Sequence, residues 1–285
     1  MQLCKLLSDS GQPRVGFVRN GQVFLLNFSL GFGYSCLSDI LHAPDPLKAI
    51  EELVDQGQTT FPVGSRHLLA PIDRQEVWAA GVTYKRSKVA REQESKGAAS
   101  FYDKVYEAAR PELFFKATAD RVVRTGDMVR VRKDSRWSVP EPELALYISP
   151  DMRIVGYSIG NDMSARDIEG ENPLYLPQAK VYNQSCALGP VVTLAAGMPA
   201  RQLIHIDLRI ERGAKIAFEG GTRLTEMARS LESLVDWLGI DNSFPHGVVL
   251  LTGTGIVPPD DFTLESGDKI TIEVTGIGRL VNTVA

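Results

Sequence analysis

The chain has 285 residues, of which 44% are hydrophobic and 23% charged, close to the averages of globular proteins. This composition excludes a disordered, fibrous or collagen-like protein, and the length allows one large domain or a small domain followed by a larger one. The 31 basic and 35 acidic residues leave a net charge of −4, which argues against a nucleic-acid partner or an anionic membrane surface.

Residues 1–70 are predicted to form a small separate α+β domain. Two short apolar runs, residues 15–18 and 23–26, are joined through Asn20-Gly21, a sequence typical of a type I′ hairpin turn. Apolar residues at helical spacing predict an amphipathic helix over residues 47–55. Pro62 and Pro71 bracket the linker to the rest of the chain.

Residues 71–285 are predicted to form a second, strand-rich domain. Residues 223–238 differ from the rest, because their apolar side chains recur three and four apart as in an amphipathic helix, with Gly239 at the position of a C-terminal cap. Apolar runs or alternation predict strands elsewhere, over residues 128–132, 144–148, 154–159, 204–210, 248–251 and 270–274.

A long, densely charged insertion, about residues 84–112, precedes the strands. Its second half has helical spacing over residues 98–110, until Pro111 ends the pattern. An insertion of this kind is often an active-site lid, and the alternative is a pair of solvated surface helices.

Three cysteines, Cys4, Cys36 and Cys186, are too few and too scattered for a disulfide framework, and there is no CxxC pair to indicate structural zinc. The first residues lack the pattern of a secretory leader, and no apolar run reaches the ~20 residues of a membrane span. We therefore expect a protein of the reducing cytoplasm.

Glu141 and Glu143 stand two residues apart at the start of a predicted strand, so both side chains project to the same face. Two carboxylates this close repel each other unless a cation or a shared proton lies between them. Asp162, at the end of the next strand, joins them if the two strands are neighbours. Three carboxylates without a nitrogen or sulfur ligand suit Mg²⁺ or Mn²⁺, whereas the alternative is an edge strand with solvated charges.

The motifs around these carboxylates resemble the fumarylacetoacetate hydrolase superfamily over roughly residues 70–280. They are, in family order, Phe114-Phe115-Lys116, Glu141-x-Glu143-Leu144-Ala145, Gly156-Tyr157 with Asn161-Asp162-Met163-Ser164-Ala165-Arg166-Asp167, Lys180 with Leu188-Gly189-Pro190, and Thr252-Gly253-Thr254-Gly255. The resemblance implies an α+β, mostly β fold, a mixed β roll with a small N-terminal domain and a helical lid, usually as a homodimer or homotetramer. It also implies that Glu141, Glu143 and Asp162 hold a divalent cation that binds a 2-oxo acid.

Members of this superfamily hydrolyse C–C bonds, decarboxylate, isomerise or dehydrate, so the resemblance alone does not give the reaction. Hydrolase and decarboxylase members carry a water-activating His, followed three residues later by a Glu, after a Gly-x-x-Tyr segment. Here Ser87 and Ala90 stand at those positions after Gly81-Val82-Thr83-Tyr84. The missing pair weakens the hydrolase interpretation.

Residues 109–118, 137–145 and 171–182 resemble the members that convert 2-dehydro-3-deoxy-D-pentonate (2-keto-3-deoxy-D-arabinonate or xylonate) to 2,5-dioxopentanoate in oxidative pentose catabolism. That dehydration needs no water nucleophile. A chelated cation would act as a Lewis acid on the C2 carbonyl, and a nearby side chain would remove a C3 proton.

The candidate acid–base residues are Glu112 and Lys180. A lysine beside a dication is pushed toward its neutral form and can act as a base, whereas a charged Lys180 that binds substrate oxygens is the alternative. Glu112 would protonate or orient the C4 hydroxyl, or only pair with Arg110. Arg166 and Asp167 are expected to pair and orient the metal ligands. The substrate-binding candidates are Tyr84, Lys116, Thr252 and Thr254, and Lys116 could instead neutralise the carboxylates.

Two other functions stay open. A hydrolase or decarboxylase of acylpyruvate-type 2,4-diketo acids would need a substitute water activator, for which Glu92 and Glu94 of the insertion are the candidates. A protein that only binds 2-oxo acids is the third possibility, and the intact Glu141, Glu143, Asp162 and Lys180 argue against it.

Overall fold

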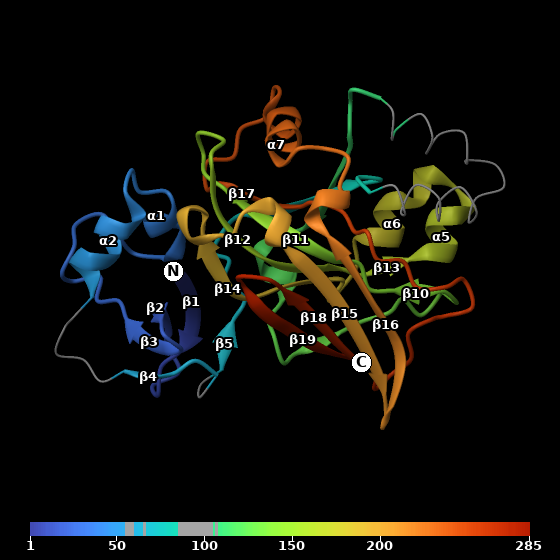
Figure 1. The fold of residues 1–285 in the computed structure, drawn as a ribbon, viewed down its shortest axis with the longest axis horizontal. Helices are drawn as coiled ribbons and strands as arrows, with labels where there is room; N and C mark the ends of the chain where they lie inside the picture. The colour runs from blue at the N-terminus through green and yellow to red at the C-terminus, as the bar shows by residue number, and fades with distance from the viewer. Residues whose placement is uncertain (55–59, 65–66, 85–104, 106–107) are drawn as a thin grey trace.

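The structure is a computed structural model, and it describes residues 1–54, 60–64, 67–84, 105 and 108–285. Among these residues three β-sheets build most of the molecule, with short helices at its two ends (Figure 1).

The largest sheet has twelve strands among the described residues. They are β1 (Gln2–Leu7), β2 (Pro13–Arg19), β3 (Gln22–Leu25), β4 (Phe61–Pro62), β5 (Leu68–Leu69), β6 (Glu76–Gly81), β7 (Glu112–Ala117), β8 (Val122–Val123), β11 (Pro142–Ile148), β12 (Ile154–Asp162), β14 (Cys186–Leu194) and β17 (Val248–Leu251). Their order is β4-β3-β2-β1-β14-β12-β11-β17-β6-β7, with β5 beside β1 and β8 beside β14. Strands far apart in the sequence therefore meet in the middle of this sheet.

A five-stranded sheet lies across the large one (Figure 1). In sheet order its strands are β16 (Lys215–Arg223), β15 (His205–Arg212), β18 (Lys269–Val274), β19 (Gly278–Val284) and β9 (Met128–Val129). The predicted alternation of β15 is confirmed, because its residues Ile206, Leu208 and Ile210 are buried and alternate with more exposed ones. These side chains share one hydrophobic core with Leu144 and Leu146 of β11, which joins the two sheets. The third sheet consists of β10 (Ser138–Val139) and β13 (Ser164–Ala165).

Five α-helices are present in the part of the chain that the structure describes. They are α1 (Leu37–Leu41), α2 (Pro46–Leu53), α5 (Arg166–Glu171), α6 (Leu176–Lys180) and α7 (Leu231–Gly239). Helices α1 and α2 cover the N-terminal strands, whereas α5 and α6 lie at the opposite end of the molecule (Figure 1). Single 3₁₀ turns complete the list: η1 (Ala119–Arg121), η2 (Pro173–Tyr175), η3 (Ala195–Gly197), η4 (Arg201–Leu203) and η5 (Leu224–Glu226).

The predicted hairpin and the first predicted helix are confirmed. Strands β2 and β3 pair up to Arg19 opposite Gln22, and both turn residues, Asn20 (φ 50°) and Gly21 (φ 73°), take the positive φ of a type I′ turn. Helix α2 begins after Asp45, whose side chain accepts hydrogen bonds from two backbone N–H groups of the first turn.

The predicted helix over residues 223–238 is wrong in its first half. Leu224 and Met227 are buried as predicted, but Leu224 belongs to a 3₁₀ turn and Met227 to the extended segment after it. Helix α7 starts only after Ser230, whose Oγ accepts the N–H of Ser233 at 3.1 Å. Gly239 is not the left-handed cap, because that conformation falls to Asp241 (φ 52°). The strand predicted over residues 128–132 is likewise reduced to the two residues of β9.

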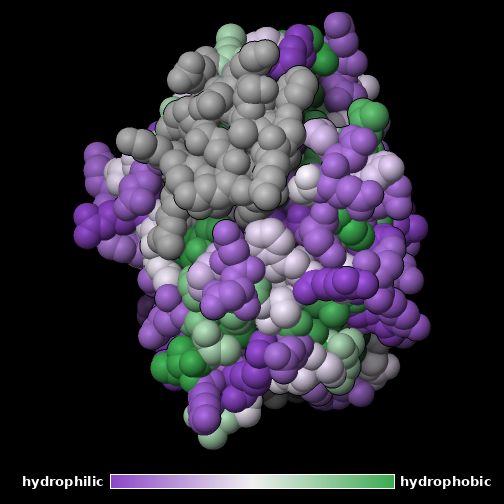
Figure 2. Space-filling model, turned by 90° about the vertical axis from the view of Figure 1, so that its right-hand side faces the viewer, coloured by the Kyte–Doolittle hydropathy of each residue, from purple (hydrophilic) through white to green (hydrophobic). Residues whose placement is uncertain are grey.

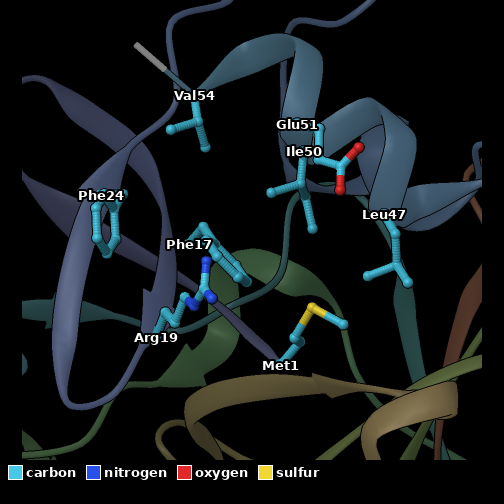
Figure 3. A pocket seen from close by; sticks show the side chains of 8 residues that line it. All are labelled: Met1, Phe17, Arg19, Phe24, Leu47, Ile50, Glu51 and Val54. Atoms are coloured by element: carbon cyan, nitrogen blue, oxygen red, sulfur yellow. The ribbon is translucent and has the colours of Figure 1, made fainter. Parts of the chain in front are cut away.

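The N-terminal strands are continuous with the large sheet, since Gln2 and Leu3 of β1 lie opposite Thr193 and Val192 of β14. The domain boundary at residue 70 stays a prediction. A mostly apolar cavity of about 480 Å³ lies between β2, β3 and α2, with Arg19 and Glu51 among its walls (Figure 3). None of the clustered carboxylates described below lines it.

The face shown in Figure 2 is mainly hydrophilic, and its hydrophobic residues are scattered or in small groups. Within the described residues, every helix is too short or too polar to cross a lipid bilayer.

Candidate active site

Glu141, Glu143 and Asp162 come together at the end of the β11–β12 pair. These strands are antiparallel neighbours, and the N–H of Asp162 donates to the carbonyl of Glu141 at 3.0 Å. One carboxylate oxygen from each residue lies within 4.8 Å of the other two, although none of the three residues is more than 4% exposed. The sequence expectation that neighbouring strands would bring the three carboxylates together is thereby met.

Glu143 is the most strongly perturbed of the three carboxyl groups. Its burial, together with the neighbouring Asp162 and Glu141 carboxylates, raises its pKa well above the usual 4.5. Its Oε2 accepts the N–H of Gly253 at 2.5 Å, which favours the ionised form. Gly253 has φ +88°, a left-handed conformation, and an added Cβ would collide with Thr83. Glycine at this position therefore allows the turn after β17 to present an N–H to Glu143.

Two lysines and one arginine surround the other two carboxylates. Lys180 Nζ donates to Glu141 Oε2 at 2.6 Å and to Asp162 Oδ2 at 3.1 Å, and its third hydrogen bond goes to Ser164 Oγ at 2.7 Å. Lys116 Nζ lies 2.5 Å from Asp162 Oδ1. Arg166 Nη2 lies 2.8 Å from Glu141 Oε1. Glu141 and Asp162 are thus each held at both oxygens by buried cations.

The donor set fits a hard divalent cation. Oxygens bound to one Mg²⁺ at about 2.1 Å lie at most about 4.2 Å apart, so the three carboxylates would need only a small inward movement. Histidine and cysteine contribute no atom to this group of described residues, which favours Mg²⁺ or Mn²⁺ over zinc. The Lys180 ammonium bridges Glu141 and Asp162, and it would have to give way to an ion bound by the same two oxygens.

A narrow cavity opens beside the carboxylates. Its walls include Gly81, Glu112, Glu141, Asp162 and Lys180, together with Ala80, Val82, Phe114, Arg166, Glu169, Gly253 and Thr254. Glu112, the predicted acid–base residue, is therefore at the cavity beside predicted metal ligands.

Glu169 was missed by sequence reasoning. It lies one helical turn after Arg166 on α5, is only 4% exposed, and lines the same cavity. The signal that could have found it is this spacing of three residues, which places two side chains on one face of a helix.

Three of the four predicted substrate-binding residues are absent from the described walls of this cavity, and only Thr254 lines it. Tyr84 is buried beside Met227, and Thr252 Oγ1 donates to the carbonyl of Leu144 at 2.9 Å. Lys116 lies behind Asp162 and also donates to two backbone carbonyls. Its surroundings favour the alternative role, neutralisation of the carboxylates.

The prediction that Arg166 and Asp167 pair with each other is wrong. Arg166 binds Glu141, but the carboxylate of Asp167 accepts from Ser135 Oγ and from the backbone N–H of Arg136, each at 2.7 Å. Successive residues of a helix point about 100° apart, so the two side chains leave α5 in different directions.

The predicted lid lies mostly outside the described residues, as do Ser87, Ala90, Glu92 and Glu94. Arg110, at its end, places its guanidinium 4.5 Å over the ring of Trp237. The four histidines, His42, His67, His205 and His246, all lie in the described residues, and none lines the cavity.

A buried cluster of oxygen ligands in a mostly β fold is typical of a metal-dependent enzyme. A profile of the family described as fumarylacetoacetate (FAA) hydrolase C-terminal matches residues 76–285, and the chain belongs to this family.

Two relatives cover most of the chain. One, from Haloferax volcanii, is named "Probable 2-keto-3-deoxyxylonate dehydratase" and is 47% identical over 219 residues, which are 77% of this chain and 75% of that protein. The other, the 2-dehydro-3-deoxy-D-arabinonate dehydratase of Saccharolobus solfataricus, is 40% identical over 228 residues, 79% of this chain and 76% of the relative.

A solved structure, 2-keto-3-deoxy-D-arabinonate dehydratase complexed with magnesium and 2,5-dioxopentanoate, matches with a TM-score of 0.84 at 33% identity. The match covers 100% of this chain and 98% of that one. The α+β, mostly β fold expected from the sequence is confirmed.

Proposed function

We propose that this protein is a Mg²⁺-dependent dehydratase that converts 2-dehydro-3-deoxy-D-pentonate to 2,5-dioxopentanoate, a step of oxidative pentose breakdown. The two relatives and the solved structure, all named for this class of reaction, support the proposal. The cluster of Glu141, Glu143 and Asp162 supports a divalent cation, with Mn²⁺ as a substitute.

One observation favours dehydration over hydrolysis. The cavity combines the carboxylate cluster with Glu112 and Lys180, but none of the chain's histidines lines it. Hydrolysis needs an activated water beside the cation, whereas elimination needs only a base near C3 and an acid near the C4 oxygen. The cavity offers groups for the second reaction.

A cation held by the three carboxylates would bind the C1 carboxylate and the C2 oxo group and make the C3 protons more acidic. Lys180 and Arg166 then bring positive charge to the same end of the cavity, where the substrate's negative charge lies. Lys116, which does not line the cavity, pairs with Asp162 and neutralises its charge.

Glu112 and Lys180 are the residues we propose for the proton transfers. The elimination breaks one C3–H bond and the C4–O bond and releases one water; tautomerisation of the resulting 5-hydroxy-3-enoate gives the C5 aldehyde. Lys180 Nζ donates three hydrogen bonds in the structure, so this arrangement holds it as an ammonium. It could act as a base only after the cation has displaced it. Glu112 lines the cavity without belonging to the carboxylate cluster.

The test is to incubate the purified protein with Mg²⁺ and 2-dehydro-3-deoxy-D-pentonate, with and without EDTA, and to follow the products by NMR. We expect 2,5-dioxopentanoate to form only without EDTA. Failure to consume the sugar acid, combined with cleavage of an acylpyruvate assayed in parallel, would replace the proposal with the hydrolase.

We also propose a cytoplasmic homodimer or homotetramer. The three cysteines carry free thiols in the structure, as a reducing compartment would keep them. Light scattering should give two or four times the chain mass of 31.3 kDa.

A further inference from the structure

Gly81 and Glu112 face each other across two neighbouring strands. Gly81 is the last residue of β6, Glu112 is the first residue of β7, and the two are direct partners in the antiparallel register. Side chains of such partners stand side by side on the same face of a sheet. Both residues also line the cavity beside the carboxylate cluster.

The space that a side chain would occupy at Gly81 is filled by Glu112. A Cβ on Gly81 would overlap Oε2 of Glu112 and lie 2.6 Å from its Cδ. Backbone conformation is not the reason for glycine here, because Gly81 is absent from the glycines with positive φ. Alanine could adopt the backbone of Gly81, and the conflict would fall on the Glu112 carboxyl group.

We propose that Gly81 is a positioning residue for Glu112. Because β6 has no side chain at Gly81, the Glu112 carboxylate can lie against the backbone of that residue. It stays in the wall of the cavity, where the reacting carbons of the sugar acid would lie. A methyl group at Gly81 turns that carboxylate away. This inference rests on the proposed function, since it assigns Glu112 a proton to carry.

The test uses Gly81→Ala, Glu112→Ala and the double variant, with Mg²⁺ and the sugar acid. We expect Gly81→Ala to lower kcat by up to about 100-fold, the loss that a displacement of about 1 Å can cause. KM and the affinity for Mg²⁺ should stay close to wild type, because Glu143 and Asp162 lie on β11 and β12 and Glu141 directly precedes β11, whereas Gly81 and Glu112 lie on β6 and β7. In the Glu112→Ala background, where the carboxylate is gone, the Gly81 substitution should cost nothing more.

The double variant is also the matched control for folding, because it carries the same added methyl group without the conflict. Three results would overturn the inference: wild-type kcat in Gly81→Ala, an equal further loss in the Glu112→Ala background, or full turnover by Glu112→Ala alone. Each leaves the dehydratase activity of the wild-type protein intact. A wild-type protein that does not dehydrate the sugar acid would instead overturn the proposed function.

Discussion

At the scale of single residues, each clustered carboxylate has a partner of its own, and Lys180 also links Glu141 with Asp162. Arg166 holds Glu141, Lys116 holds Asp162, and the N–H of Gly253 holds Glu143. Among the described residues Glu143 is the one member of the three that is in no ion pair, and its burial together with the neighbouring Asp162 and Glu141 carboxylates raises its pKa well above 4.5. The repulsion among the three carboxylates therefore acts mainly on Glu143, and a bound cation would favour its ionised form.

We expect Glu143→Gln to abolish Mg²⁺ binding and turnover while the fold survives. Loss of a residue that only orients a metal ligand typically lowers the affinity for the metal about 10–100-fold, so loss of a ligand itself should lower it more. The neutral amide also removes a buried charge, so the thermal midpoint without Mg²⁺ should not fall. Calorimetric titration and thermal unfolding, each with and without Mg²⁺, check both parts. Glu273→Gln, on the exposed side of β18, is the control; full activity of Glu143→Gln would rule out the proposed metal site.

Lys180→Met should keep Mg²⁺ binding and lose turnover. The variant removes an ammonium that is bonded to Glu141 Oε2 and Asp162 Oδ2 and leaves both oxygens available, so affinity for Mg²⁺ should hold or increase. Loss of an acid–base group typically lowers kcat about 10²–10⁴-fold. Metal titration and steady-state kinetics measure the two effects, with the exposed Lys269→Met as control. If turnover persists, Lys180 is not the base.

At the scale of elements, although β19 alternates between buried and more exposed residues and was missed, sequence patterns predicted several elements with one exposed face. The alternation of β15 and the hairpin turn of β2 and β3 are examples. Strand β14 escaped prediction because nearly all of it is buried and it contains Gly189 and Pro190, whereas β16 carries mostly exposed residues and two adjacent glycines. Neither has the alternation that marks a half-buried strand.

The site was predictable to the extent that its residues belong to recognisable motifs. The Glu-x-Glu pair and Asp162 needed only two adjacent strands. The cavity walls needed distant segments, since β6 and β7 reach the site through β17, which lies between β11 and β6. That packing also decides which polar groups face the cavity. Thr252 and Lys116 do not line it, because they form hydrogen bonds and ion pairs with other parts of the protein.

Helix α7 offers a test of where an element begins. Ser230 Oγ accepts the N–H of Ser233, and loss of such a cap costs about 1 kcal/mol. We expect Ser230→Ala to lower the free energy of urea-induced unfolding by about that amount. Ser233→Ala keeps the N–H donor and should have a smaller effect; equal effects would contradict the assigned start.

At the scale of the whole molecule, Asp73 fastens the N-terminal elements together. It pairs with Lys5 of β1 at 2.6 Å and accepts hydrogen bonds from the N–H and hydroxyl of Ser38 in α1. Burial alone would raise the pKa of Asp73, but Lys5 and these hydrogen bonds outweigh it and lower the pKa below 3.8. Since the folded state binds this proton less readily than the unfolded state, the stabilisation is present above about pH 4 and lost as the pH falls through the folded pKa.

We expect Asp73→Asn to lower the free energy of unfolding by about 1–3 kcal/mol at pH 7. The difference from wild type should shrink as the pH falls below about 4, because the wild-type carboxylate is then protonated too. Urea unfolding at pH 7 and pH 3 measures this. A difference that is the same at both pH values would show that Asp73 acts through shape and not charge; the exposed Asp260→Asn is the control.

The pairing of β1 with β14 also affects synthesis of the chain. Strand β1 can pair with β2 at once, but Thr193, the partner of Gln2 across the other edge, is made about 190 residues later. At 5–20 residues per second, ribosomes take about 10–40 s to cover that distance. Strand β5 can cover Lys5 and Leu6 on this edge much earlier. Gln2 and Leu3 stay open through most of translation, and this is the stage at which we expect the nascent protein to need a chaperone most.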